Sequence, residues 1–530
     1  MQNKVKSVET HIVFHFANGS TYELPLKTNS PSQQLPTYGR SVRLKEGLYT
    51  RSSNNIVGNI VGNTLDIEVV SYDKLLLPTN ALSPYYGYMD DTAYVEVTCD
   101  VMDDIVEGQP YSVYMGRYMV DTWQGGNTSA TTNEVSISCV DIMSRVKNIA
   151  IDKLRLRRNI SFNDYIKVVI NALNAKLPSY MQILYTDADL NIWKNSPYPW
   201  QMYFNNIDRD NVENLFNCIA KYTISYIWIS RDRHIKTDHL LDDTPQESVG
   251  ILSGSSNLLS YGTQTGDIDK YSGVKVKYIQ SVSPKDEQLL QLSDVQLYAG
   301  ENSFVDQRLS SDKVWDIHTI DVKCESGTGV VTSFLNYKNS IDFTIEATKK
   351  TKATITIYGY VMNESYGVIE KYKNDNIKDG VIEIENRVLI SDLVSTYVDG
   401  LINLMSMKNN QVYAEGFINP RIKLGDLVQL QGSNMNINDY YKVTSLEYTL
   451  GTNYRCKATM IKTIETPRNI EDILYRHNEL LLSAISGESV LGSSYPDITS
   501  AENTRCEEEL AEPLEDLREV LEEYGGQGNG

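Results

Sequence analysis

Cysteine and histidine are scarce, with six of each in 530 residues. The cysteines are far apart and form no C-x-x-C motif; they are Cys99, Cys139, Cys218, Cys324, Cys456 and Cys506. This spacing predicts reduced, mostly buried thiols rather than a disulfide framework. His234 and His239 lie five residues apart with no cysteine nearby, a spacing that argues against a zinc site.

Long apolar runs are missing too. No stretch approaches the roughly 18 apolar residues that a membrane-spanning helix needs. The N-terminus, from Met1 to Val5, lacks the apolar core of a signal peptide. We therefore expect no membrane-spanning segment and a protein that is made and assembled in a cytoplasm.

Motifs for catalysis and cofactor binding are absent as well: the sequence has no G-x-S-x-G, Walker loop, G-x-G-x-x-G or H-E-x-x-H. Residues 187–191 begin like a calcium loop, but Ile192 and Tyr198 replace the required glycine and glutamate. Three acidic pairs could serve a glycosidase, yet each falls in a predicted turn or loop: Asp90–Asp91, Asp103–Asp104 and Asp242–Asp243. We expect no enzyme, no cofactor and no bound metal.

The net charge is −20, from 49 basic and 69 acidic residues. Such a surface repels DNA phosphates, which disfavours sequence-independent nucleic-acid binding by the exterior. Tyrosine is abundant, with 36 Tyr against 9 Phe. Tyrosine is favoured at protein interfaces, although half-exposed strand positions explain the excess equally well.

The first 150 residues predict short, regularly spaced strands. Residues 65–70, 94–99 and 135–140 alternate apolar and polar side chains, a pattern typical of a barrel or sandwich. Residues 11–26 predict a hairpin turning at Asn18-Gly19, because both residues tolerate positive φ. A second hairpin is predicted with its turn at residues 124–127, Gln-Gly-Gly-Asn.

Helices are predicted from Ser161, from Asp210 and over about 391–406, where a capping residue precedes an apolar stripe. The second of these leads into a hairpin over residues 224–237 with an Arg-Asp-Arg turn. Further strands are predicted over 274–278, 353–358 and 411–464.

Two segments are candidates for docking a partner. The only dense cationic run, residues 153–158, contains Arg155, Arg157 and Arg158; its alternative interpretation is a solvated face. Residues 501–524 hold ten acids against two arginines, a net charge of −8, and carry Leu510, Leu514, Leu517 and Leu521. These leucines are compatible with a short coiled coil, a docking helix or an acidic tail.

Three stretches resemble the tail-hub family of contractile-phage baseplate hubs, tail-tip proteins and type VI secretion spike hubs. In residues 416–428, Pro420 precedes Gly425-Asp426 and an apolar strand, and a closing strand follows at 440–448. We interpret the Gly-Asp turn as closing a barrel. Residues 161–237 are similar to the hub's α/β domain, and residues 269–278 are similar to the strand that re-enters the second barrel.

The resemblance implies a mainly β, α+β fold with two similar antiparallel β-barrels and an inserted α/β domain. Residues 1–150 would form the first barrel, and residues 263–281 and 409–466 the second. Residues 151–262 and 282–408 would form the α/β domain, and residues 467–530 an acidic helical segment.

The same resemblance implies a non-enzymatic homotrimer in the virion tail. Its six barrels would match a six-fold tail tube and offer a three-fold platform to a separate spike or lysin. Further implied partners are distal tail or baseplate ring proteins and the tape measure protein, with DNA passing through the channel without specific binding. The alternatives are another baseplate or distal-tail ring component, a peptidoglycan-degrading tail-tip enzyme, and a carbohydrate-binding receptor protein.

Overall fold

The chain is mainly β in the computed structural model, with a few helices beside the sheets. No described helix has the length and apolar character needed to cross a membrane. The structure describes residues 5–26, 35–48, 50–52, 55–103, 109–129, 132–150, 162–190, 211–223, 225–239, 249–254, 257–263, 271–311, 314–337, 340–373, 380–406, 411–432 and 437–462.

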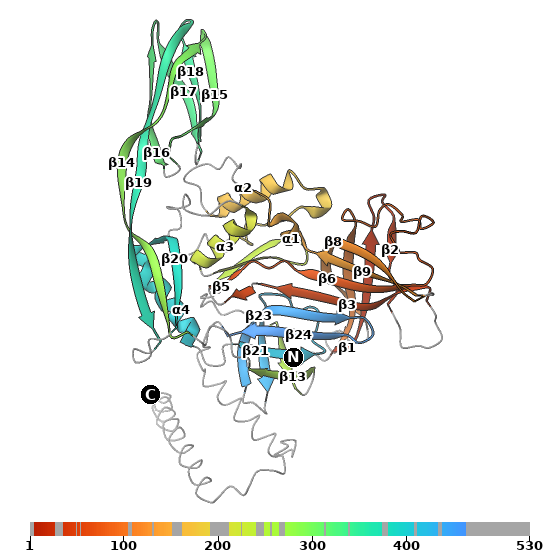
Figure 1. Ribbon diagram of the computed structural model, residues 1–530. Helices are drawn as coiled ribbons and strands as arrows, with labels where there is room; N and C mark the ends of the chain where they lie inside the picture. The colour runs from red at the N-terminus through yellow and green to blue at the C-terminus, as the bar shows by residue number, and fades with distance from the viewer. Residues whose placement is uncertain are drawn as a thin grey trace, which may run out of the picture. The chain divides into compact units, whose positions relative to one another are not determined.

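One curled sheet of thirteen strands contains most of the N- and C-terminal strands (Figure 1). We call its first part the N-terminal module; it comprises β1 (Val5–His15), β2 (Thr21–Glu23), β3 (Thr37–Gly47), β6 (Thr64–Ser71), β7 (Tyr94–Asp103), β8 (Tyr111–Ser129) and β9 (Thr132–Val140). The C-terminal module comprises β12 (Gly250–Ser253), β13 (Leu258–Thr263), β21 (Gln411–Gly416), β22 (Leu427–Gly432), β23 (Ile437–Leu450) and β24 (Arg455–Ile461).

The two modules share one strand order. Neighbouring strands run β1-β7-β8-β9-β6-β3 in the first and β12-β22-β23-β24-β21-β13 in the second. Matched by position, the strands also follow the same order along the chain. Four of the five pairings are antiparallel in both modules. The fifth differs, because β12 is parallel to β22 whereas β1 is antiparallel to β7. The sheet is therefore a duplicated topology.

Each module is organised around a long strand that changes partner. β8 pairs with β7 up to Met119 and with β9 from Met119 onward. β23 pairs with β22 up to Lys442 and with β24 from Lys442 onward. Beyond Lys442, β3 also pairs with β23, over residues 42–47 and 445–450. We call this antiparallel contact the seam, because it joins the two modules into one sheet.

The predicted strands 65–70, 94–99 and 135–140 are confirmed as β6, β7 and β9, and their alternate side chains are buried. The first predicted hairpin is also confirmed: Gly19 has φ +82° and β1 pairs with β2. The second is wrong, because residues 124–127 lie inside β8. A Cβ atom on Gly125 would lie 2.5 Å from Leu77 Cδ1. This glycine permits close packing and does not form a turn.

The helical part follows β9 and has its own apolar core. It contains α1 (Ile142–Val146), α2 (Phe162–Asn174), a 3₁₀ turn (Ser179–Met181), α3 (Val212–Thr223) and the hairpin of β10 (Ser225–Ile229) and β11 (Ile235–His239). The predicted helices are confirmed, although Ser161 and Asp210 lie outside the described residues. Asn211 caps α3, since its Oδ1 accepts the Asn214 N–H at 2.8 Å.

A long insertion separates β13 from β21. It contains β14 (Gly273–Leu297), β15 (Gly300–Arg308), β16 (Val314–Cys324), β17 (Gly329–Asn336), β18 (Ser340–Ala347), β19 (Thr351–Tyr372), β20 (Val381–Ile390) and α4 (Ser391–Ser406), as predicted for this helix. A short pair, β4 (Thr50–Ser52) and β5 (Asn55–Asn59), lies between β3 and β6.

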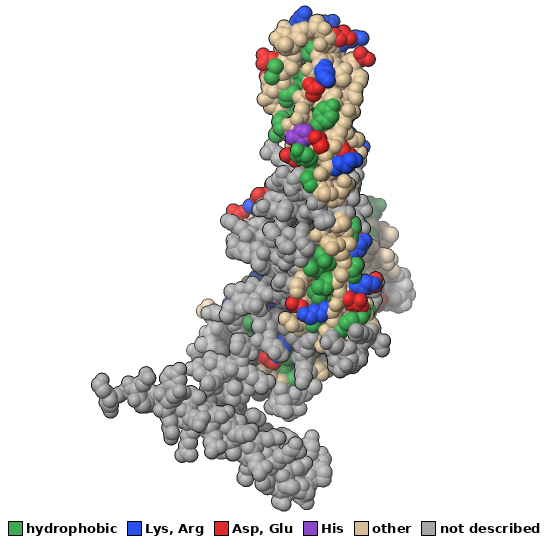
Figure 2. All heavy atoms as spheres, turned by 90° about the vertical axis from the view of Figure 1, so that its left-hand side faces the viewer, with side chains coloured by type: hydrophobic (Ala, Val, Ile, Leu, Met, Phe, Trp, Pro, Cys, Tyr) green, Lys and Arg blue, Asp and Glu red, His purple; other side chains and the backbone are tan. Residues whose placement is uncertain are grey.

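The insertion contains a strand that we expected elsewhere. β14, which includes residues 273–281 of the predicted second-barrel segment 263–281, pairs with β19 and β20 in a separate four-stranded sheet. The reason is packing: Val274 and Val276 are buried in a cluster that includes the apolar face of α4. Lys275 and Lys277 alternate with these valines and form ion pairs with Glu383 and Glu385 of β20. Figure 2 shows basic and acidic side chains interleaved with hydrophobic ones on one side of the molecule.

Candidate functional site at the junction of the two modules

The loop between β21 and β22, residues 417–426, contains the predicted barrel-closing residues; we call it the junction loop. Gly425 has φ +84°, which favours glycine. Asp426 Oδ2 accepts the Lys423 N–H at 2.7 Å, and the Gly425 N–H donates to the Val443 carbonyl at 2.9 Å. Pro420, Gly425 and Asp426 therefore belong to one turn that leads into β22.

Gly425 also has a close neighbour. A Cβ atom at this position would lie 3.0 Å from Cζ2 of Trp228, a β10 side chain that is 8 % exposed. The backbone angle and the approach of Trp228 both favour glycine here. The junction loop thus contacts the helical part of the chain as well as the sheet.

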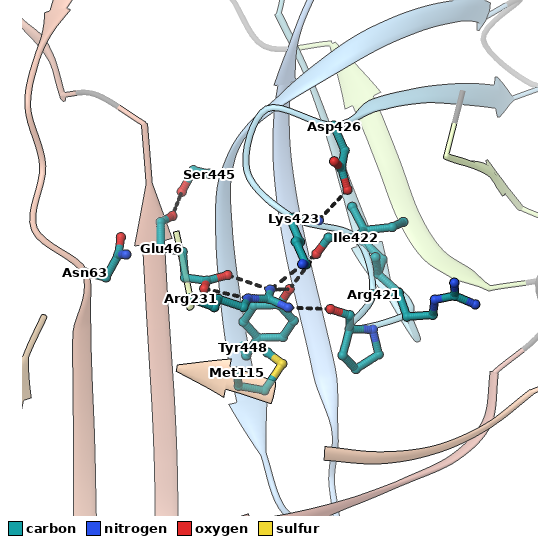
Figure 3. A network of polar contacts seen from close by, with 12 residues as sticks. Glu46, Asn63, Met115, Arg231, Arg421, Ile422, Lys423, Asp426, Ser445 and Tyr448 are labelled. Atoms are coloured by element: carbon teal, nitrogen blue, oxygen red, sulfur yellow. Dashed lines mark hydrogen bonds and ion pairs between the residues drawn. The ribbon is translucent and has the colours of Figure 1, made fainter. Parts of the chain in front are cut away.

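Arg231, from the turn between β10 and β11, is the centre of a buried polar network (Figure 3). Its Nε and Nη2 donate to the Glu46 carboxylate of β3 at 2.8 and 2.7 Å. The guanidinium also donates to the carbonyls of Pro420 and Ile422 and, at 2.8 Å, to the Tyr448 hydroxyl of β23. One side chain therefore connects both modules, the helical part and the junction loop.

The Arg231–Glu46 pair is almost fully desolvated, with side chains 5 % and 2 % exposed. Burial alone would lower the pKa of Arg231, but the adjacent Glu46 carboxylate raises it well above its usual range. Removing one partner of such a pair leaves a buried charge uncompensated, which typically costs about 3–5 kcal/mol. The pair therefore makes the relative placement of the two modules sensitive to either residue.

A second set of contacts fixes the junction loop to the N-terminal module. Asn419 Nδ2 donates to Asp103 Oδ2 of β7 at 2.9 Å and to the Tyr111 hydroxyl of β8 at 2.8 Å. Tyr111 itself donates to Asp103 at 2.6 Å. The Arg421 guanidinium lies 5.4 Å from the Tyr111 ring centroid. The loop is thus tied to the ends of β7 and β8.

Asp189, from the calcium-like stretch, has a different role from metal binding. Its carboxylate accepts hydrogen bonds from Lys236, from His234 at 3.0 Å and from the Thr186 N–H at 2.8 Å. Burial opposes ionisation, but the bonds from Lys236 and His234 lower the pKa of Asp189 well below its usual range. The carboxylate fixes the loop onto β11. A cavity of about 470 Å³ opens between this loop and the junction loop.

The other predicted acids and thiols take structural positions where they are described. Asp90 accepts the Thr92 N–H at 3.0 Å and Asp103 holds the junction loop. Cys99, Cys139 and Cys456 are buried thiols, as predicted, and burial raises the pKa of Cys99 to about 11. Outside the described residues lie Asp104, Asp242, Asp243, Arg155, Arg157, Arg158, Leu510, Leu514, Leu517 and Leu521.

Sequence reasoning missed the Glu46–Arg231–Tyr448 network, although one signal was present. In β3, the alternate residues Val42, Leu44 and Glu46 all point into the core. A buried carboxylate needs a partner, so the position of Glu46 predicts a nearby cation. The sequence does not show that this cation comes from the Arg-Asp-Arg turn, 185 residues further along the chain.

No protein-family model matches this sequence, and no curated protein matches it. Similar solved structures include a tail protein from Neisseria meningitidis MC58, with TM-score 0.44 and 8 % identity over 86 % of this chain and 97 % of that one. The 43 kDa tail protein of prophage MuSo2 from Shewanella oneidensis has TM-score 0.43 and 10 % identity over 86 % and 98 %. A prophage tail protein from Listeria monocytogenes EGD-e has TM-score 0.41 and 8 % identity over 89 % and 99 %. The first of these structures is described as a tail protein and the other two as prophage tail proteins.

Proposed function

We propose that this chain is a structural hub of a phage-type tail, three copies of which form a ring between a six-fold tail tube and a three-fold spike or tip. The observation that carries the proposal is the duplicated strand order of the two modules in one sheet. Three such chains supply six like-folded modules, so a three-fold assembly can face a six-fold partner.

The junction gives the duplication its rigidity. The seam, the Arg231–Glu46 pair and the Asn419 contacts fix one module against the other. A ring that imitates six-fold symmetry needs six modules at regular intervals, and a loose linker within each chain would not provide them. In this proposal the first hub barrel is formed by residues 1–150, and the second by residues 409–466 together with β12 and β13.

The remaining parts supply contacts to neighbours. We assign the helical part and the insertion to the proposed α/β domain and its surroundings, and residues 467–530 to docking a separate spike or lysin. The tube, the baseplate ring and the tape measure protein are the other proposed partners. An overall charge of −20 suits a channel through which DNA passes without adhering. No catalytic role is proposed, because the described Asp90, Asp103 and Asp189 carboxylates are engaged in structural contacts.

The test is the mass of the assembled full chain, combined with its position on virions by antibody labelling in the electron microscope. We expect three copies and a label on the axis at the tip end of the tail. Six copies would favour the alternative, a distal-tail or other baseplate ring component. Release of fragments from purified peptidoglycan, abolished by an Asp→Asn change, would favour the tail-tip enzyme instead.

A further inference from the structure

The seam shows how one module can join the next. β22 covers one side of β23 only up to Lys442, and the open side of β23 beyond this point is used by β3. The contact is six residue pairs long, from Val42–Leu450 to Gly47–Ser445. In the strand order of its module, β3 is the last strand. The rule within the chain is that the last strand of one module pairs with the long strand of the other.

The N-terminal module has the same opening on its own long strand. β7 covers one side of β8 only up to Met119, while β9 covers the other side through Ser129. In the described part of the chain, no strand pairs with β8 beyond Met119 on the side where β7 ends. Residues 121, 122 and 124–126 are exposed, whereas Tyr448 of β23, the equivalent of Gly125, is buried.

The C-terminal module ends in a strand that fits this opening. β13 occupies in its module the position that β3 occupies in the other. In the registers with β6 and β21, Thr263 of β13 corresponds to Leu44 of β3, so Tyr261–Thr263 correspond to the seam residues 42–44. Among the described strands β13 pairs only with β21, and Leu259 is 55 % exposed. An apolar strand at a sheet edge offers unpaired backbone groups to a further strand.

The two openings are not paired with each other within one chain. From β8 to β13 the sheet order passes through β9, β6, β3, β23, β24 and β21. Seven strand spacings of about 4.8 Å separate them, roughly 34 Å along the sheet. A contact between these two different surfaces is heterologous. Such a contact repeats from one copy to the next, and it forms a closed ring when the rotation between neighbouring copies allows closure.

We propose that residues 261–263 of β13 in one copy pair with residues 125–127 of β8 in the next copy, so that the contact between chains repeats the seam within the chain. The occupant of each open edge is thus a second copy of this chain. The inference rests on the proposed hub function, since it states how three chains close the ring. It predicts a continuous sheet in which seams within and between copies alternate.

The test uses two variants of the full chain, each with one added cysteine, Gly126→Cys and Ser260→Cys, mixed and treated with a short bismaleimide. In the repeated seam these two positions are diagonal neighbours on one face. We expect a covalent dimer in the mixture that neither variant nor the wild-type chain gives alone. Because each variant carries only one of the two new thiols, a product found only in the mixture joins different copies. A covalent dimer formed equally well by Gly126→Cys alone would show that the contact does not need β13, and would overturn the proposal.

A second measurement uses a charged side chain to block the edge. Leu259→Lys should weaken association by at least about tenfold, as measured by the mass distribution against concentration. The matched control is Leu335→Lys, because Leu335 is 43 % exposed in β17, which belongs to a separate three-stranded sheet; it should leave association unchanged. Circular dichroism should show that both variants remain folded.

The outcomes separate this inference from the proposed function. Three-copy rings without the mixed crosslink would overturn the β13–β8 contact and leave the hub assignment standing. Six-copy rings with the crosslink would keep the contact and contradict the three-copy hub. A chain that stays single at every concentration would overturn the contact, and the position of the label on the tail would then decide the function.

Discussion

The two modules of the sheet have one topology but unequal strands. The first has an 11-residue β1, an 11-residue β3 and a 19-residue β8. Their counterparts β12, β13 and β23 have 4, 6 and 14 residues. The second module therefore has fewer ladder hydrogen bonds of its own. It compensates through the junction loop; the counterpart of this loop, between β6 and β7, forms no hydrogen bond to the other module among the described residues. Duplication preserves the strand order, while the contacts that stabilise each copy diverge.

The largest predicted effect comes from breaking the buried pair that joins the modules. Arg231→Ala or Glu46→Ala should each lower the free energy of unfolding by about 3–5 kcal/mol, because the remaining charge stays buried without a partner. Urea denaturation measures the loss. The double variant Glu46→Ala/Arg231→Ala should lose less than the sum of the two single changes. Additive losses would show that the two residues act independently.

Asp141 is a buried acid that, unlike Glu46, forms no ion pair among the described residues. Asp141 follows β9 and caps α1, accepting the Ser144 N–H at 3.0 Å, while its Oδ2 has no partner among the described residues. Burial raises the pKa of Asp141 to about 6. The folded state therefore binds this proton more tightly than the unfolded state, and stability present below pH ~4 is lost as the pH rises to 6.

Asp141→Asn should remove this pH dependence, which amounts to roughly 3 kcal/mol for two pKa units. Asparagine is an equally good N-cap, so α1 should remain. The measurement is the free energy of unfolding of both proteins between pH 4 and 7. Parallel curves would contradict the assignment of a raised pKa to Asp141.

The two turn glycines test one loop in each module. Gly19 and Gly425 have nearly the same φ, +82° and +84°, but a Cβ atom meets nothing within 4 Å at Gly19 and meets Trp228 at 3.0 Å at Gly425. Gly19→Ala should cost about 1 kcal/mol from backbone strain alone, and Gly425→Ala about 2–3 kcal/mol. Thermal unfolding compares them. Equal costs would mean that the Trp228 contact is unimportant.

The smallest predicted effect lies on the outer face of the seam. Lys45 precedes Glu46 in β3 and pairs with Glu447 of β23 at 2.8 Å, but the two side chains are 64 % and 48 % exposed. Lys45→Ala should cost less than about 1 kcal/mol, and the loss should shrink further in salt. A loss comparable to that of Glu46→Ala would show that burial does not set the strength of the seam contacts.

Periodicity predicted most elements of the fold, because alternation and capping are local. The strands β6, β7 and β9 and the helix over 391–406 follow from such patterns. The turn at residues 124–127 failed because glycine serves close packing as well as turns, and only the position of Leu77 distinguishes the two. The sequence predicted only part of the junction. Pro420, Gly425 and Asp426 mark the loop, but its partners come from distant segments; they are Glu46, Asp103 and Arg231. Contacts of such sequence separation follow from topology and not from local pattern.

The central claim is that three chains present six similar modules. Electron-microscope class averages of the assembled full chain, with the copy number determined by mass measurement, test it most directly. The account predicts a ring of three copies with six similar lobes around a central channel. A ring with six copies, or three copies that form only three lobes, would contradict it.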